Sequence, residues 1–74
     1  MGLHELLPGQ QGRVQQLTQT GAFRRRLLDL GFVPDTAVEC LCRSPGGDPT
    51  AYLVRGAVIA LRVGDAAKIW VTRT

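Results

Sequence analysis

Two cysteines separated by one residue, Cys40 and Cys42, come closest to a metal or redox pattern in this sequence. In a β-strand, residues i and i+2 point to the same side and lie roughly 6–7 Å apart, which is poor geometry for a disulfide. A zinc or iron site would need two further ligands, and only His4 and scattered carboxylates are available. We therefore predict that Cys40 is a small core residue, that Cys42 fills one end of a small barrel, and that neither holds a metal.

The residue types needed for catalysis are also scarce. His4 is the only histidine, and no serine–histidine–acid set can be assembled around it. The glycine-rich segment 44–49 lacks the Lys-Ser/Thr pair of a phosphate-binding loop. We predict that the protein is not an enzyme and needs no cofactor.

Arg24, Arg25 and Arg26 form the only cluster of charge in the sequence. Such a cluster is typical of a solvated helix face, and it also suits docking to an acidic partner. A third alternative is an arginine finger supplied to the active site of a GTPase. We retain all three arginines as candidates for a protein-interaction surface.

Three further residues are candidates for the same kind of surface: Tyr52, Arg55 and Trp70. Tyrosine, tryptophan and arginine dominate the energetics of protein interfaces, which is the reason for choosing them. Trp70 alternates with Ile69 and Val71, so it should face outward if those two residues face the core. A tryptophan that merely covers the outside of the barrel would show the same pattern.

The clearest element in the sequence is a helix over residues 21–30. Phe23, Leu27 and Leu30 recur at helical spacing and predict the buried face of this helix. Gly31 follows where a left-handed capping residue belongs.

Strand patterns occupy the rest of the chain, and Arg55-Gly56 between two of them predicts a tight hairpin. Five short strands hide their edges best by curling into a barrel, with the helix covering one open side. We predict a mostly β fold: a small barrel of about five strands, with one helix inserted after the first. The predicted strands cover residues 12–18, 36–43, 50–54, 57–63 and 68–72.

The size and charge of the chain further limit the classes of function that it could have. The chain of 74 residues predicts one domain over residues 1–74. Its net charge of +3 permits an acidic partner, and its few aromatic residues argue against a nucleic-acid binder that stacks bases. The sequence shows no signal peptide and no long apolar stretch, so we expect a cytoplasmic protein that meets membranes only through a partner.

Several stretches resemble the FeoA family, small cytosolic accessory proteins of bacterial ferrous iron transport. Residues 26–34 (RLLDLGFVP) are similar to the family's helix-to-strand junction, and residues 47–49 (GDP) precede a strand as they do in the family. The remaining similarities are Leu7-Pro8-Gly9 near the start and the closing pattern of Leu61-Arg62, Ala66, Ile69 and Val71. The family often has Pro-Gly where this chain has Pro34-Asp35, which bears on the local backbone shape.

The resemblance implies an SH3-like barrel and a role beside FeoB, a membrane transporter of Fe(II) with a cytosolic G-protein domain. A protein that binds the cytosolic part of this transporter and modulates its activity is therefore the expected function. The alternative is a small barrel that binds nucleic acid or acts as a regulatory interaction module. The modest charge and the few aromatic residues count against nucleic acid as a partner.

Overall fold

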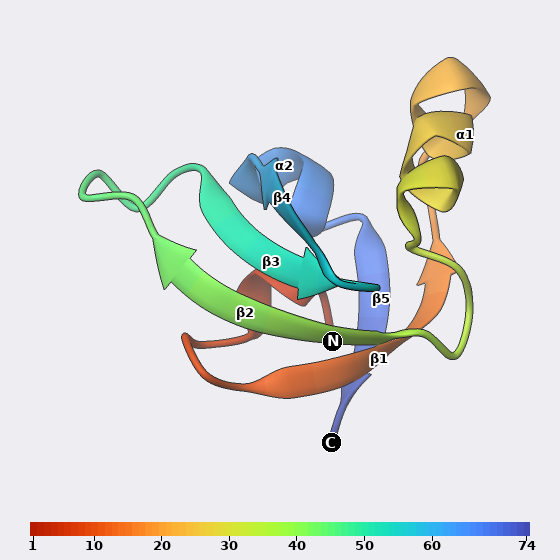
Figure 1. Ribbon diagram of the computed structural model, residues 1–74. Coiled ribbons are helices and arrows are strands. Elements are labelled where there is room, and N and C mark those ends of the chain that lie inside the picture. Colours follow the sequence, from red (N-terminus) through yellow and green to blue (C-terminus); the bar gives the residue numbers. More distant parts are fainter.

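Five antiparallel strands form one strongly curved sheet in the computed structural model, which describes residues 1–74 (Figure 1). Neighbouring strands follow the order β4-β3-β2-β1-β5. The predicted fold, an SH3-like β-barrel of five strands with a helix after the first, is confirmed. The elements are a 3-10 helix (Leu3–Glu5), β1 (Gln11–Leu17), α1 (Gly21–Leu30), β2 (Ala37–Arg43), β3 (Thr50–Val54), β4 (Ala57–Leu61), α2 (Val63–Ala66) and β5 (Ile69–Arg73).

One cluster of fourteen buried apolar residues fills the barrel. It includes Leu27, whose helical spacing predicted burial, and Ile69 and Val71, which flank Trp70 on β5. Leu30 was predicted on the same face as Leu27, but it is only partly buried and packs against this cluster, as Ile59 does.

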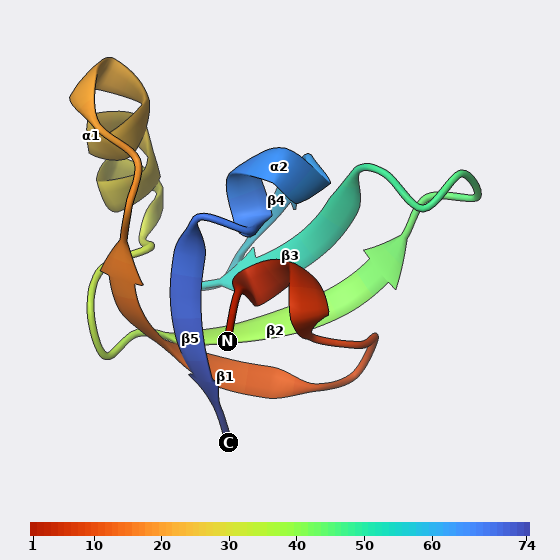
Figure 2. The same cartoon turned by 180° about the vertical axis from the view of Figure 1, so that it is seen from behind.

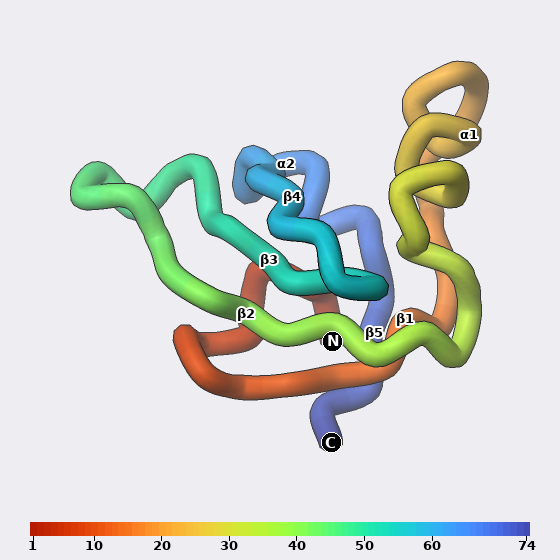
Figure 3. Tube along the Cα trace, viewed as in Figure 1, coloured from red at the N-terminus to blue at the C-terminus, as the bar shows by residue number.

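The amino-terminal segment closes the barrel beside β5 (Figures 2 and 3). Leu3 and Leu6 are fully buried in the core. Met1 exchanges two backbone hydrogen bonds with Val71, of 3.1 and 2.8 Å, and Gly2 forms a bridge to Trp70. These contacts cover the edge of β5 that β1 leaves free.

Helix α1 extends beyond the end of the strands in both views of the ribbon (Figures 1 and 2). Residues 21–26 are exposed, and only the last turns pack on the barrel, through Leu27 and partly through Leu28 and Leu30. The expectation that Phe23 belongs to the buried face is wrong, because its side chain is 38% exposed. No helix of this protein has the length and apolar character needed to cross a bilayer.

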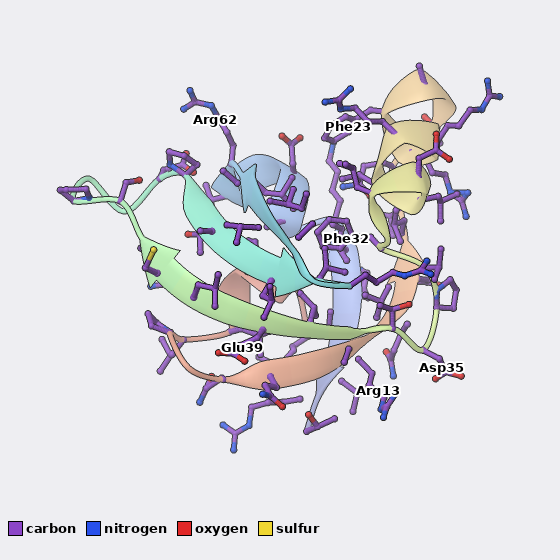
Figure 4. The ribbon with its side chains drawn as sticks, viewed as in Figure 1. Arg13, Phe23, Phe32, Asp35, Glu39 and Arg62 are labelled. Atoms are coloured by element: carbon purple, nitrogen blue, oxygen red, sulfur yellow. The ribbon has the colours of Figure 1, made fainter.

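Arg55, Gly56 and Asp35 all have positive φ angles. Arg55 and Gly56 have φ of 50° and 79° and join β3 to β4 in a two-residue hairpin, as expected. Asp35 has φ of 72°, so an aspartate adopts here the left-handed conformation that glycine adopts most readily. The Arg13 side chain donates a 2.8 Å hydrogen bond to the Asp35 carbonyl, and the two residues lie together in Figure 4.

The structure corrects the prediction for Cys42. The β2–β3 register shifts between Cys40 and Cys42, so the side-chain alternation is interrupted there. Cys40 is buried as predicted, whereas Cys42 is exposed and does not fill the end of the barrel.

Candidate protein-interaction surface

The cap at the carboxyl end of α1 fixes the position of the helix. Gly31 has φ of 116°, and its N–H donates to the Leu28 carbonyl at 3.1 Å, while the Phe32 N–H donates to the Leu27 carbonyl at 3.0 Å. This pair of bonds is a Schellman motif, in which the two residues of the outer bond, here Leu27 and Phe32, normally also make an apolar contact. Leu27 and Phe32 are both fully buried. The cap therefore anchors one end of α1 in the core and leaves the other end in solvent.

The three arginines of the predicted cluster all lie on this exposed part of α1. Successive helical residues point about 100° apart, so Arg24, Arg25 and Arg26 spread over about 200° of the helix instead of forming one stripe. Arg25 and Arg26 border a shallow depression, together with Ala22, Asp29 and Leu30. The helix thus presents positive charge in several directions.

Arg55 lies near the carboxyl end of the same helix. Its aliphatic stem passes over Gly31, which brings the β3–β4 hairpin against the cap of α1. Arg55 also borders a second shallow depression, which Gln11, Glu39 and Leu53 help to line. The structure therefore places Arg55 beside the capped end of α1, whereas the three arginines of the cluster lie on its exposed part.

Trp70 lies elsewhere, on β5 at the other end of the strand order. Its side chain is 44% exposed, which agrees with the predicted outward direction, whereas Ile69 and Val71 are buried. It pairs across the strands with Gln16, where the β1–β5 register shifts. Trp70 lines neither of the two depressions that the arginines border.

Tyr52 is not a surface residue, and this part of the prediction is wrong. The side chain is 1% exposed because β3 turns Thr50, Tyr52 and Val54 toward the core. Burial raises the pKa of the Tyr52 hydroxyl, and burial likewise raises the pKa of the Cys40 thiol that pairs with it across β2 and β3. Both groups are therefore held in their neutral forms.

Potential metal ligands do not gather in the structure. No group of three or more His, Cys, Asp or Glu side chains is close enough to share an ion. His4 is half-buried, and its ring lies against Gly2, where an added Cβ would come within 2.6 Å of the ring.

The exposure of β4 is the feature that sequence reasoning missed. Val58 is 65% exposed, and both Ala57 and Ala60 are exposed, although the strand carries only apolar residues. The strand order gives the reason, because β4 lies at an edge of the sheet. A pattern of apolar residues alone does not reveal which strand is at the edge.

The model of the FeoA domain family matches residues 1–73. This chain belongs to the FeoA family. The FeoA family consists of accessory proteins of ferrous iron transport, so this part of the functional prediction is confirmed.

Individual FeoA relatives agree with the family match. The chain is 37% identical over 69 residues to the Fe(2+) transport protein A/Fe(2+) transporter FeoB fusion protein of Porphyromonas gingivalis. The match covers 93% of this chain but only 8% of that much longer protein.

Two solved FeoA structures share the fold. The FeoA protein of Chlorobium tepidum is 34% identical, with a TM-score of 0.93, and the match covers 99% of this chain and 70% of that one. FeoA of Stenotrophomonas maltophilia, described as an SH3 domain protein complexed with zinc, is 32% identical, with a TM-score of 0.85. That match covers 97% of this chain and 89% of that one.

Proposed function

We propose that this protein binds the cytosolic part of a FeoB-type Fe(II) transporter and modulates iron uptake without handling iron itself. The observation that carries the proposal is the P. gingivalis relative, in which a FeoA-like segment and a FeoB transporter share one polypeptide. Covalent linkage raises the effective concentration of one module near the other, which is useful when the two modules act together. We further propose that the protein works in the cytoplasm as one domain over residues 1–74.

Binding is the activity that the surface supports. Among the arginine side chains, Arg13 and Arg43 donate hydrogen bonds within the protein, and those of α1 and the β3–β4 hairpin do not. Arg24, Arg25, Arg26 and Arg55 are therefore free to pair with carboxylates of a partner. A partner that bound one conformation of the transporter more tightly would shift its population toward that state, which is sufficient for modulation.

Two charge-matched variants distinguish the two candidate docking surfaces. The double variant Arg25→Glu with Arg26→Glu reverses two charges on α1, and Lys68→Glu with Arg73→Glu reverses two charges around Trp70 on the β5 side. All four residues are exposed, so the fold should survive each change. Binding to the purified transporter should fall for the α1 variant and remain for the β5 variant. The reverse result would move the dock to Trp70, and Trp70→Ala would then abolish binding.

Iron uptake provides the cellular test. Cells that lack the gene should take up radioactive Fe(II) more slowly, and the wild-type gene should restore uptake better than the α1 variant. If uptake is unchanged by the deletion and the pure protein does not bind the transporter, the proposed function is wrong. Tight binding of the pure protein to nucleic acid would then favour the alternative of a small nucleic-acid-binding barrel.

A further inference from the structure

Strand β4 has one free edge with unpaired backbone groups. It pairs with β3 through a two-residue hairpin, in which Val54 and Ala57 face each other next to the turn. In an antiparallel pair, hydrogen-bonded positions alternate with positions whose N–H and C=O point away. Ala57, Ile59 and Leu61 therefore bond to β3, while the backbone groups of Val58 and Ala60 point outward. Neither residue takes part in any hydrogen bond beyond the strand pairing.

The usual protections of an exposed edge are missing from β4. Natural edge strands carry charges, proline or a bulge, or they are covered by another segment. Strand β4 reads Ala-Val-Ile-Ala-Leu, and its register with β3 is regular from Thr50 to Val54. The opposite edge of the sheet, at β5, is covered by Met1 and Gly2. The molecule thus covers one edge and leaves the other open.

Positive charge flanks the open edge at both ends. Arg55 precedes β4 and Arg62 follows it, and both are exposed. Figure 4 shows Arg62 projecting away from the barrel. Asp48 and Asp65 lie near the Arg62 end, but the Asp48 carboxylate already accepts a 2.9 Å hydrogen bond from the Val63 N–H. No residue of β4 is charged.

We propose that the edge of β4 binds an extended acidic segment of a partner protein, which adds as a sixth strand. The backbone groups of Val58 and Ala60 would supply hydrogen bonds to its main chain, and Arg55 and Arg62 would pair with acidic residues at its two ends. Apolar side chains at alternate positions of the segment would pack beside exposed Val58.

The same charges disfavour a second copy of this chain as the occupant. Antiparallel pairing of two β4 strands about a two-fold axis would set Arg55 of each copy beside Arg62 of the other. Like charges facing each other across strands are destabilising. The inference goes beyond the proposed function, because it specifies the ligand by its chemistry and holds whether or not the segment belongs to a transporter.

A displayed library of random seven-residue peptides tests the proposal. Selection on the immobilised protein should enrich peptides with Asp or Glu near both ends and β-branched residues between them. A synthetic copy of an enriched peptide should slow hydrogen exchange of the Val58 and Ala60 amides by about tenfold or more, as new backbone hydrogen bonds do.

Matched variants at one position then isolate the backbone contact. Val58→Pro removes an outward N–H without touching the bonds to β3, and it should weaken peptide binding by about tenfold. Val58→Thr keeps the N–H and strand propensity, so it should bind as the wild type does. If Val58→Pro fails to fold, the double variant Arg55→Gln with Arg62→Gln, which keeps the backbone, should weaken binding of the acidic peptide instead.

Three results would overturn the inference. They are a selection that enriches no acidic peptides, peptides that bind Val58→Pro as well as the wild type, and protection of the Val58 and Ala60 amides that grows with protein concentration alone. The last result would mean that a second copy covers the edge. Transporter binding that survives Val58→Pro, together with a failed selection, would defeat this inference and leave the proposed function standing. Peptide binding without transporter binding would support this inference and defeat the proposed function.

Discussion

The side chain of Arg55 lies so close over Gly31 that a Cβ built on the glycine would come 2.8 Å from Arg55 Cδ. Both residues have positive φ angles, 50° for Arg55 and 116° for Gly31. Arg55 begins the turn after β3, and Gly31 caps α1, the only long helix. This single contact therefore couples the position of basic helix α1 to the β3–β4 hairpin.

Gly31→Ala should destabilise the protein for two separate reasons. A residue with a side chain is strained at this φ, by roughly 1–2 kcal/mol, and the new methyl group would also push against Arg55. Urea unfolding of the single variants and of the double variant with Arg55→Ala separates the two effects. The loss should be smaller in the Arg55→Ala background, by the steric part alone. Equal losses in both backgrounds would show that Arg55 moves aside freely.

Leu27→Ala should be the most damaging truncation in α1. The side chain is fully buried, so its removal leaves a cavity that costs about 2–5 kcal/mol in the free energy of unfolding. Phe23→Ala is the matched control on the same helix, and its exposed ring predicts a loss below about 1 kcal/mol. Comparable losses in urea unfolding would mean that α1 packs through a different face.

Alkaline pH should destabilise the protein through Tyr52 and Cys40. The pKa of each is raised by burial, so the folded state holds the proton more tightly than the unfolded state does. Tyr52 stabilises the fold fully below its unfolded pKa of about 10, and this stabilisation is lost as the pH rises from there through the folded pKa. The stabilisation by Cys40 is lost in the same way as the pH rises above about 9.0. Urea unfolding at increasing pH should show this fall. Tyr52→Phe should remove the loss of stability above pH about 10. If the stability of this variant falls with pH as steeply as that of the wild type, Tyr52 is not the cause.

The two cysteines should differ sharply in reactivity. Cys42 is exposed, whereas Cys40 is buried and its pKa is raised, which lowers the fraction of reactive thiolate. A thiol-specific dye should therefore label the native protein rapidly at one site and the urea-unfolded protein at both. Loss of the rapid phase in Cys42→Ser, with no change in Cys40→Ala, would assign the site. Equal labelling of both thiols in the native state would contradict the register shift in β2.

The sequence predicted local structure well because local signals determine it. The spacing of apolar residues and Gly31 located α1, and Arg55-Gly56 located the hairpin. Side-chain direction was harder to predict, because one inserted residue reverses it. The bulge between Cys40 and Cys42 exposed a residue expected to be inside, and no residue type marks that bulge.

The interaction surface was predictable only in part. The arginines of α1 and Trp70 are exposed as expected, since charge and strand alternation are visible in the sequence. The prediction that Tyr52 lies at the surface failed because tyrosine suits interfaces and cores equally. Only the pairing of β3 with β2 and β4 decides between the two. The open edge of β4 depends on strand order, which arises from contacts between distant parts of the chain.

The pairing of β5 with the first residues of the chain has a consequence during translation. Val71 forms a hydrogen bond with Met1, and β5 also pairs with β1, so these early segments lack a partner until β5 has been synthesised. The barrel cannot close until residue 73 has left the ribosomal exit tunnel. Until then β1 lacks its outer neighbour and is open to pairing with other nascent chains. This vulnerable state therefore lasts from the emergence of β1 until β5 has also emerged from the ribosome.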